Sequence, residues 1–573
     1  MRRTVTGEQL QLLPDTLSPP LRRVYAARGV SAQQLETPLS AMLPVSTLEG
    51  TEAAAERFAA ARHNHERVLI VGDFDADGAT ATALMMTCLR AYGFNAPAYL
   101  VPDRFRFGYG LSPALVAAAR ELQPDLIVTV DNGISSHAGV VAARQAGIEV
   151  LITDHHLPGD TLPDAAVIVN PNLTDSRFGS KALSGVGVAF YVMAALGQRL
   201  ATDGLLDAGI ARAICADCLD LVAVGTVADL VPLDYNNRVL VSQGMRRIRA
   251  GQTRPGIQAM FAAAGRNPVQ ATTADLGFAI APRLNAAGRL EDISLGIECL
   301  LASTQRDAGE KASILSRLNE ERKELQASMQ ADADLHIDTS LEGLAEGVDD
   351  LRASCLFDPS WHQGVVGLVA TKIKDRLNRP VIAFAHGEEE GLLKGSGRSV
   401  RGVHMRDILA TLDARHPGMI LRFGGHAMAA GLSLAFDQLE AFRDAFTREL
   451  AEHLTHIDDE QRLLSDGELT VAELGLPLAE QMRVAAPWGQ GFPEPLFDGR
   501  FELVSQRIVG DKHLKLSLRH REGGDAVDAI AFFHPDLLPA PSGSECIVAY
   551  KLDVNEFRGR RRHQLVVEHI ECV

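Results

Sequence analysis

Short apolar runs alternate with longer mixed stretches between about residue 66 and residue 172. The strand-like runs are VLIVGD, APAYLV, DLIVTVDNG, IEVLITDHH and AAVIVNPN, and the helix-like stretches between them are ATATALMMTCLRAYG, LVAAAREL and VVAARQAG. Short runs rich in β-branched side chains and bounded by turn residues are typical of buried strands. Strands that alternate with helices predict an α/β fold with a mostly parallel, doubly wound sheet.

The pattern becomes more helical over residues 211 to 301, and a long amphipathic stretch follows. Apolar residues recur in it at intervals of three and four, which is typical of a helix with one buried face. They are Ala308, Ala312, Leu315, Leu318, Leu325, Met329 and Ala333, and Arg322 interrupts the stripe. We expect a helix that links two bodies. A second α/β unit starts in VDDLRASCLF and ends near residue 453.

Five strand-like runs follow residue 464. They are FELVSQRIV, HLKLSLRH, DAVDAIAFF, ECIVAYKLDV and HQLVVEHIE, separated by turn signals such as Glu522-Gly523-Gly524. Five short strands in about a hundred residues favour a small closed β-barrel, with the OB-fold as the commonest candidate. We therefore expect a helical lead-in at 1–45, the doubly wound domain at 46–240, a helical region with the linking helix at 241–345, the second α/β domain at 346–455 and the barrel at 464–573.

Length, composition and charge limit the class of protein. At ~150 residues per domain, 573 residues suggest about four domains. No apolar stretch reaches the ~18 residues of a membrane span, and the start MRRTVTGEQLQLLPD lacks an apolar signal core, so we expect a cytoplasmic protein with no membrane partner. A net charge of −17 argues against a basic coat for nucleic acid, although a cleft can differ from the whole.

The seven cysteines are odd in number and scattered, so they do not make a disulfide framework. Cys215 and Cys218 form one CxxC. Without a second pair or a nearby histidine, two helical thiols explain this spacing better than a metal site.

Acidic residues and histidines follow several of the apolar runs. VLIV is followed by Asp73, Asp75 and Asp77. This spacing resembles the start of an EF-hand loop, but Leu84 stands where the twelfth loop position needs a bidentate Glu, and a strand precedes it instead of a helix. The other positions are Asp131 after LIVTV, Asp154, His155 and His156 after VLIT, and Asp229 after LVAVGTVA. Because parallel strands end at one edge of a sheet, we expect these side chains to converge there.

Carboxylates gathered so closely raise one another's pKa unless a divalent cation neutralises them. The cluster therefore predicts metal. Oxygen ligands with one or two imidazoles suit Mn²⁺ or Mg²⁺ better than a structural zinc. About five ligands leave room for two ions at ~3.5–4 Å, the arrangement used in phosphoryl displacement. We expect a hydrolytic phosphoesterase.

Four segments, GDFDADGATATAL, VDNGI, TDHH and VADLVPL, resemble the four motifs of the DHH phosphoesterase superfamily. The rest of the chain resembles one branch of it, the bacterial exonucleases specific for single strands. The segments that carry this resemblance are PRLNAAGRL, WHQGVVG, GSGRS, GGHAMAAG, PWGQGFPEPLFDG and NEFRG. The similarity covers nearly all of the chain beyond about the first forty residues.

The resemblance implies roles for the clustered residues. The metal ligands would be Asp75, Asp77, Asp131, His155 and Asp229, with Asp131 as the bridge and Asp73 as a further ligand. His156 would act on the reacting phosphate, although a neutral packing role stays open. Asp154 would orient a ligand. The reaction would be two-metal, in-line hydrolysis of single-stranded DNA from 5′ to 3′, releasing 5′-mononucleotides in recombination and repair.

Other residues are candidates for holding the strand. In the second α/β unit, glycines in GSGRS and GGHAMAAG would let backbone amides approach a phosphate. The candidates are Tyr109, Arg283, Asn285, Arg289, Ser396, Arg398, Ser399, His426, Lys512, Lys515, Arg558 and Arg560. The alternatives are a buried core role for Tyr109, helix-to-helix contacts for the arginines of PRLNAAGRL, and a solvated β-turn for the arginine run after Phe557.

The resemblance also suggests a monomer that works with a single-strand-binding protein and a recombination helicase. Two other functions are open. One is a DHH enzyme acting on short oligonucleotides or cyclic dinucleotides, but those relatives are compact and lack a barrel. The other is a replication scaffold, which should have lost the metal-binding acids that this chain keeps.

Overall fold

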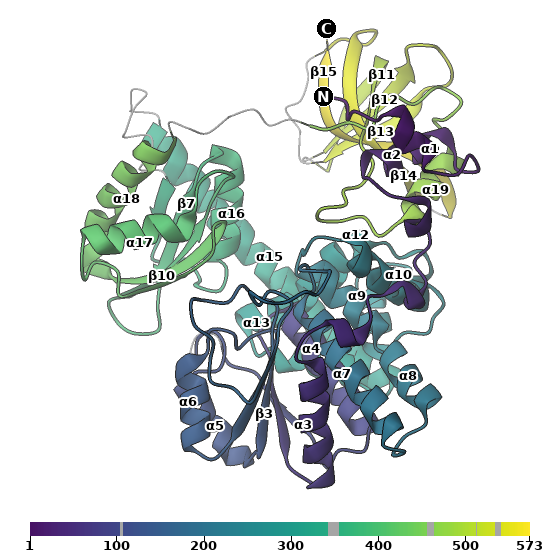
Figure 1. The fold of residues 1–573 in the computed structure, drawn as a ribbon. Coiled ribbons are helices and arrows are strands. Elements are labelled where there is room, and N and C mark those ends of the chain that lie inside the picture. Colours follow the sequence, from purple (N-terminus) through teal and green to yellow (C-terminus); the bar gives the residue numbers. More distant parts are fainter. Residues whose placement is uncertain are drawn as a thin grey trace.

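The computed structural model describes residues 1–103, 107–341, 354–454, 463–510, 513–532, 540–557 and 559–572. Figure 1 shows a lower α/β and helical body, a second α/β unit connected to it by a long helix, and a barrel above it. None of the helices in these residues is both long and apolar enough to cross a membrane.

The lower body contains the predicted parallel sheet. Its strand order is β2-β1-β3-β4-β5, with all neighbours parallel. The strands are β1 (Val68–Val71), β2 (Ala98–Leu100), β3 (Leu126–Val130), β4 (Glu149–Thr153) and β5 (Val167–Val169). One face is covered by α5 (Pro113–Ala119) and α6 (His137–Gln145), and the other by α3 (Thr51–His63), α4 (Ala76–Ala91) and α7 (Gly185–Thr202). Helices on both faces confirm the doubly wound fold.

The helical region continues this body. Its elements are α8 (Ala208–Ala216), α9 (Leu219–Ala228), α10 (Tyr235–Arg249), α11 (Pro255–Ala263), α12 (Thr273–Asp275), the π-helix η6 (Leu276–Ile280), α13 (Ala281–Leu290) and α14 (Ser294–Leu301). The linking helix is α15 (Gln305–Leu341), longer than its amphipathic stripe. Ala308 to Leu318 pack in the core of the body, whereas Met329 and Ala333 pack in a core of the second unit, which confirms the linking role.

The second α/β unit has a mixed sheet of order β6-β7-β8-β10-β9. Only β6 and β7 are parallel, and the other neighbours are antiparallel. Its strands are β6 (Cys355–Phe357), β7 (Val381–His386), β8 (Leu392–Arg398), β9 (Arg422–Gly425) and β10 (Ala429–Ala435), and its helices are α16 (Val366–Leu377), α17 (Met405–Arg415) and α18 (Leu439–Leu454).

The C-terminal strands close into a barrel in the order β11-β12-β13-β15-β14, as predicted. They are β11 (Phe497–Val509), β12 (His513–His520), β13 (Val527–Phe532), β14 (Glu545–Phe557) and β15 (Arg560–Cys572), with α19 (Leu476–Ala485) before them. The loop before β11 attaches the barrel to the body. Thr273 Oγ1 donates to the carbonyl of Trp488 at 2.6 Å, and the Leu233 amide donates to Gln490 at 2.7 Å.

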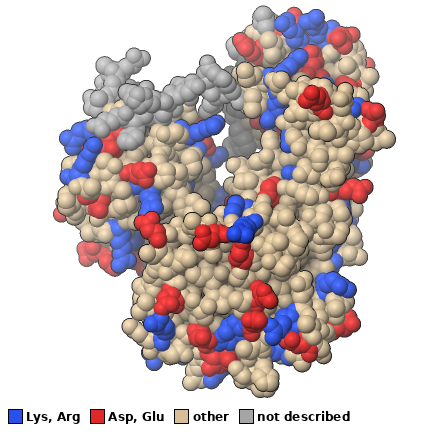
Figure 2. All heavy atoms as spheres, in the orientation of Figure 1, with Lys and Arg blue, Asp and Glu red and all other residues tan. Residues whose placement is uncertain are grey.

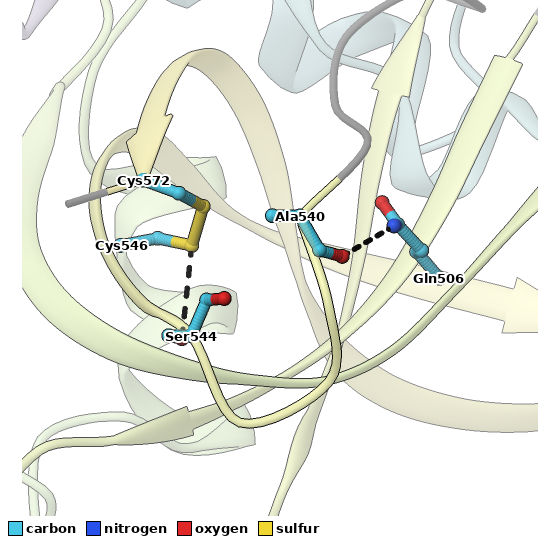
Figure 3. Close-up of a disulfide and its surroundings, with 5 residues drawn as sticks. All are labelled: Gln506, Ala540, Ser544, Cys546 and Cys572. Atoms are coloured by element: carbon cyan, nitrogen blue, oxygen red, sulfur yellow. Dashed lines mark hydrogen bonds between the residues drawn. A yellow bond between two sulfur atoms is a disulfide. The ribbon is translucent and has the colours of Figure 1, made fainter.

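One disulfide is present, although the cysteine spacing gave no sign of one. Cys546 and Cys572 lie directly opposite each other on the antiparallel strands β14 and β15, and Figure 3 shows the bond between them. Strand register creates this proximity, and register is not visible in a separation of 26 residues. Cys215 and Cys218 are free, buried thiols, as expected.

The N-terminal residues pack on the barrel side of the molecule, which the sequence did not predict. They contain α1 (Gly7–Gln11) and α2 (Pro19–Ala27). Arg28 forms a buried ion pair with Asp466 at 2.8 Å, and the Tyr25 hydroxyl donates to the carbonyl of Ala485. Figure 1 shows the N and C labels close together beside the barrel.

Candidate metal centre

Seven of the eight predicted acidic and imidazole residues follow strands of the parallel sheet. Asp73, Asp75 and Asp77 follow β1, with Asp75 as the N-cap of α4. Asp131 follows β3, and Asp154, His155 and His156 follow β4. All of them lie at the carboxyl edge, as in other open α/β sheets.

Asp229 reaches the same place from a helix, which corrects the expectation of a strand. It is the C-cap of α9. Residues 219–226 of this helix are buried on every side, so the run has no helical periodicity and resembles a buried strand in sequence.

Three sets of side chains in the described residues bring one ligand atom each to within 4.8 Å of one another. They are Asp73-Asp75-Asp131, Asp77-His155-Asp229 and Asp131-His155-His156. Asp131 and His155 each belong to two sets. The sets therefore form one continuous cluster.

Asp131 occupies the middle of this cluster. Its Oδ1 lies 3.0 Å from His155 Nε2, yet both atoms are buried and neither makes a hydrogen bond within the described structure. His155 Nε2 also lies 3.5 Å from Asp229 Oδ2. The φ of Asp131, 63°, is left-handed, which is uncommon for a residue with a Cβ. Unpaired buried atoms facing one another are the arrangement that a cation would complete.

Glycines make room for the carboxylates. The amides of Gly185 and Val186, at the start of α7, donate to the two oxygens of Asp77 at 2.6 and 2.9 Å. A Cβ on Gly185 would lie 2.4 Å from Asp131 Oδ1, and a Cβ on Gly225 would lie 2.6 Å from Asp77 Oδ1. Only glycine fits at these two positions. Neither glycine was predicted from the sequence. For Gly185, the N-cap residue Ser184 in front of a glycine-rich helix start was a signal that could have indicated this site.

Asp154, predicted to orient a metal ligand, is hydrogen-bonded to both histidines. It is buried and accepts hydrogen bonds from the amides of His155 and His156 and from His156 Nδ1 at 2.8 Å. Asn172 and Asn170 donate to the carbonyls of the same histidines.

The pKa values of the clustered carboxyl groups are raised because these groups are buried close to one another. Burial, and then the charge of Asp75, raises the pKa of Asp77 to about 7. Burial, with the charges of Asp77 and Asp75, raises the pKa of Asp229 to about 9 and that of Asp131 well above its ordinary value. Burial and the charge of His156 lower the pKa of His155 to about 4, so its ring is neutral and can coordinate a metal.

His156 behaves differently from His155. The pKa of His156 is raised to about 9. Burial by itself would lower this pKa, but the hydrogen bond to Asp154 and the negative charges of Asp154 and Asp229 outweigh the effect of burial. The ring therefore carries a positive charge beside the cluster. Tyr109 directs its hydroxyl towards His156, 3.3 Å from Nδ1, and donates to the carbonyl of Asp131 at 3.1 Å. Tyr109 is 51% exposed, which excludes the buried core role.

The second α/β unit faces the centre. The ring of His426 stacks on that of His156 with centroids 6.4 Å apart, and Arg289 of α13 donates to the carbonyl of Gly364 at 3.2 Å. Asn285 accepts a hydrogen bond from the Ala76 amide, beside the carboxylates. Arg398 donates to Ser396 Oγ at 3.0 Å, and a Cβ on Gly367 would meet both side chains.

Three of the groups predicted to contact the strand have other partners in the structure. Arg283 is 8% exposed and donates to Ser316 Oγ and to the carbonyl of Ala279, so it joins α13 to α15, which is the alternative left open for it. Ser399 is buried and donates to the carbonyl of Val403. The glycines of GSGRS lie within β8, whose backbone pairs with β7 and β10, so they make room for packing instead of offering amides to a phosphate.

Two of the four candidate residues on the barrel, Lys515 and Arg560, lie within the described residues. Arg560 is exposed at the start of β15, and Lys515 pairs with Asp528 at 3.4 Å. Lys512 and Arg558 lie outside the described residues.

Comparison with known proteins agrees with this architecture. Residues 67–226 match the DHH family N-terminal domain, residues 350–452 the DHHA1 domain and residues 465–569 the RecJ OB domain. All of the chain aligns at 53% identity with 98% of the single-stranded-DNA-specific exonuclease RecJ of Dickeya dadantii, and 97% of it aligns at 52% identity with 96% of the Escherichia coli protein.

A crystal structure of RecJ from Thermus thermophilus in complex with Mn²⁺ is similar to 99% of this chain, with a TM-score of 0.80, 29% identity and 78% of that chain covered. The Mg²⁺ complex gives a TM-score of 0.74 at 27% identity, covering 99% of this chain and 77% of that one. This chain therefore belongs to the RecJ family of single-stranded-DNA-specific exonucleases, with a DHH domain, a DHHA1 domain and an OB domain.

Proposed function

We propose that this protein removes 5′-mononucleotides from the 5′ end of single-stranded DNA, using a pair of Mn²⁺ or Mg²⁺ ions. The observation that carries the proposal is the continuous cluster of carboxylates and imidazoles around Asp131 and His155, in which the buried atoms Asp131 Oδ1 and His155 Nε2 face each other without a hydrogen bond. The ligands we propose are Asp73, Asp75, Asp77, Asp131, His155 and Asp229. Oxygen donors with one imidazole fit these ions. Bound as a pair, the ions would neutralise the phosphodiester and make water more acidic.

The side chains around the cluster have distinct tasks in this proposal. Asp154 fixes the orientation of both histidines. The positively charged His156 donates a hydrogen bond to a phosphate oxygen, and His426 stands opposite it on the second unit. The exposed ring of Tyr109 stacks on the terminal base. In this proposal Asn285, Arg289, Ser396 and Arg398 contact the strand between the two units.

The surface also fits a strand with unpaired bases. Figure 2 shows basic and acidic side chains intermixed over this face, without a broad basic coat, and a hollow between the second α/β unit and the barrel. On the barrel, Arg560 is exposed at the start of β15 and Phe532 is partly exposed at the end of β13, so a cation and an aromatic ring are available at separate points along a bound strand. We further propose that the protein acts as a monomer with a single-strand-binding protein and a recombination helicase.

The activity is tested with DNA labelled at the 5′ or the 3′ end, as single strand and as duplex, in Mn²⁺ or in EDTA. We expect the 5′ label to be released first as a mononucleotide, from single strands only, and only with Mn²⁺. Equal cleavage of duplex, activity that survives EDTA, or first release of the 3′ label would each contradict the proposal.

Replacing Asp154 with Asn should lower activity by ~10–100-fold, as loss of a residue that orients metal ligands does. Asn keeps one oxygen for the bonds that Asp154 Oδ1 accepts from the two histidines, but it loses the negative charge that holds the His156 ring, and its amide nitrogen cannot accept the bond that Oδ2 accepts from the Ile134 amide. Metal affinity measured by calorimetry and kcat measured on a single strand should fall together. Parent values for both would show that Asp154 is not an orienting residue.

A further inference from the structure

A basic cavity lies between the helical region and the barrel, away from the carboxylate cluster. Its volume is about 730 Å³, and six Arg or Lys residues but only three acids line it, in a protein whose net charge is −17. Residues of α10, α12, η6, α19 and the barrel strands β13 to β15 contribute to its wall.

Three arginines of this cavity are unneutralised. Arg246 and Arg249 come from α10, and Arg483 comes from α19. The three guanidinium groups line the same cavity, and burial with the charges of Arg483 and Arg246 lowers the pKa of Arg249 although the charge of Asp275 opposes the shift. Of the other three cations, Lys551 pairs with Glu494 and Arg266 lies 3.7 Å from Asp275, whereas Arg238 is held by the carbonyl of Leu233 and lies over the ring of Phe492.

Hydrogen bonds position two of these groups without neutralising them. Arg249 Nε donates to the carbonyl of Ala271 at 2.8 Å, and Arg246 donates to Thr37. Among the described residues, no carboxylate forms an ion pair with Arg246, Arg249 or Arg483. Like charges held together in this way favour an anion between them.

An exposed aromatic residue lies at the same cavity. Phe278 belongs to the π-helix η6 and is 86% exposed, so it contributes little to the core. Single turns of π-helix occur often at functional sites. A ring beside cations suits an unpaired base next to its phosphate.

The π-helix η6 continues directly into α13, which reaches the metal centre. Phe278 stands seven residues before Asn285, whose side chain contacts the Ala76 amide at the carboxylate cluster. At ~1.5 Å per helical residue, the separation along the axis is about 10 Å. A strand whose end lies at the metal centre can therefore reach the cavity within a few nucleotides.

We propose that Arg246, Arg249 and Arg483, with Phe278 at the mouth, bind the single strand that has not yet reached the metal centre. This inference rests on the proposed exonuclease function and adds to it a second contact with the substrate. It predicts that long strands depend on the cavity and that a dinucleotide does not.

The test uses the full chain with Arg249→Ala and Arg483→Ala combined, and Phe278→Ala separately. Binding of a strand longer than ~16 nucleotides, in EDTA, should weaken about tenfold or more in each. The slope of log affinity against log salt concentration should become shallower by ~0.7 for each phosphate that the double variant no longer neutralises. That slope should not change for Phe278→Ala. Cleavage of a dinucleotide should keep its parent rate in both.

Two controls complete the design. Arg247→Ala removes the next arginine of α10, which pairs with Asp217 outside this cavity, and should bind like the parent. Lysines at 249 and 483 should restore most of the salt dependence. If the double alanine variant does not fold, the Phe278→Ala variant alone tests the inference, because the Phe278 side chain is exposed and its loss should not disturb folding.

Parent-like binding of long strands by Phe278→Ala and by the alanine pair would overturn the inference and leave the cavity to another anionic partner, such as an acidic protein segment. A parent protein that cleaves no dinucleotide and no single strand would instead contradict the exonuclease function itself, whereas the binding comparison in EDTA would still report on the cavity.

Discussion

Asp131→Asn should lower the rate of single-strand cleavage by at least about 10³-fold. Loss of one preorganised electrostatic group in an active site costs ~10²–10³-fold, and Asp131 belongs to two of the ligand sets. The rate is measured on a 5′-labelled single strand in saturating Mn²⁺. A variant that keeps a tenth of the parent activity would contradict the central place of Asp131.

The same variant should unfold at a higher temperature than the parent in EDTA. Neutralising Asp131 removes the cost of burying its charge and the repulsion from Asp77 and Asp75, which together raise its pKa. Activity and stability would then change in opposite directions, as they do where an active site holds strained charges. Asp164→Asn is the matched control, because Asp164 is exposed and pairs with Arg144.

The stabilising effect of Mn²⁺ should grow as the pH rises from about 5 to about 8. An Asp in the unfolded chain has a pKa of ~3.9, whereas the folded-state pKa of Asp77 is about 7 and that of Asp229 about 9. Above pH ~4 the unfolded state loses protons that the folded state retains, so stability without metal falls as the pH rises towards these values. One pKa unit corresponds to ~1.4 kcal/mol, so the raised pKa of Asp77 alone lowers the free energy of unfolding by on the order of a few kcal/mol.

A cation reverses this loss because it binds the ionised carboxylates of the folded state. Mn²⁺ at a hundred times its Kd adds ~2.7 kcal/mol to the free energy of unfolding. The melting temperature is followed across this pH range in EDTA and in Mn²⁺. Asp154 and Asp220 have lowered pKa values, so their contributions are complete above pH ~4 and do not change within the range. A Mn²⁺ effect that is absent, or equal at every pH, would rule out the carboxylate cluster as the cation site.

The sequence predicted the sheet, the linking helix and the barrel because each has a clear hydrophobic period or boundary. It predicted the metal cluster because successive parallel strands end at one edge, so proximity follows from topology. Asp229 joined the cluster from a buried helix, where the absence of a polar face removed the helical period. The type of element was therefore wrong, although the convergence of the residue was correctly predicted.

Features that depend on register or on packing between distant segments were not predictable. The pairing of Cys546 with Cys572 requires the alignment of β14 with β15. The glycines of GSGRS carried no sign of being inside a strand, and the burial of Arg283 depends on α15. The arginine cavity combines α10 with α19, and no local pattern connects these helices.

The ion pair between Arg28 and Asp466 has a consequence for synthesis on the ribosome. The two residues are 438 positions apart. At a synthesis rate of ~5–20 residues per second, roughly 20–90 s pass between the synthesis of the N-terminal helices and the synthesis of the residues that pack on them. Val24 and Tyr25, buried in the finished molecule, are exposed to solvent and chaperones throughout that interval. These N-terminal residues are thus synthesised long before the segment that completes their native contacts.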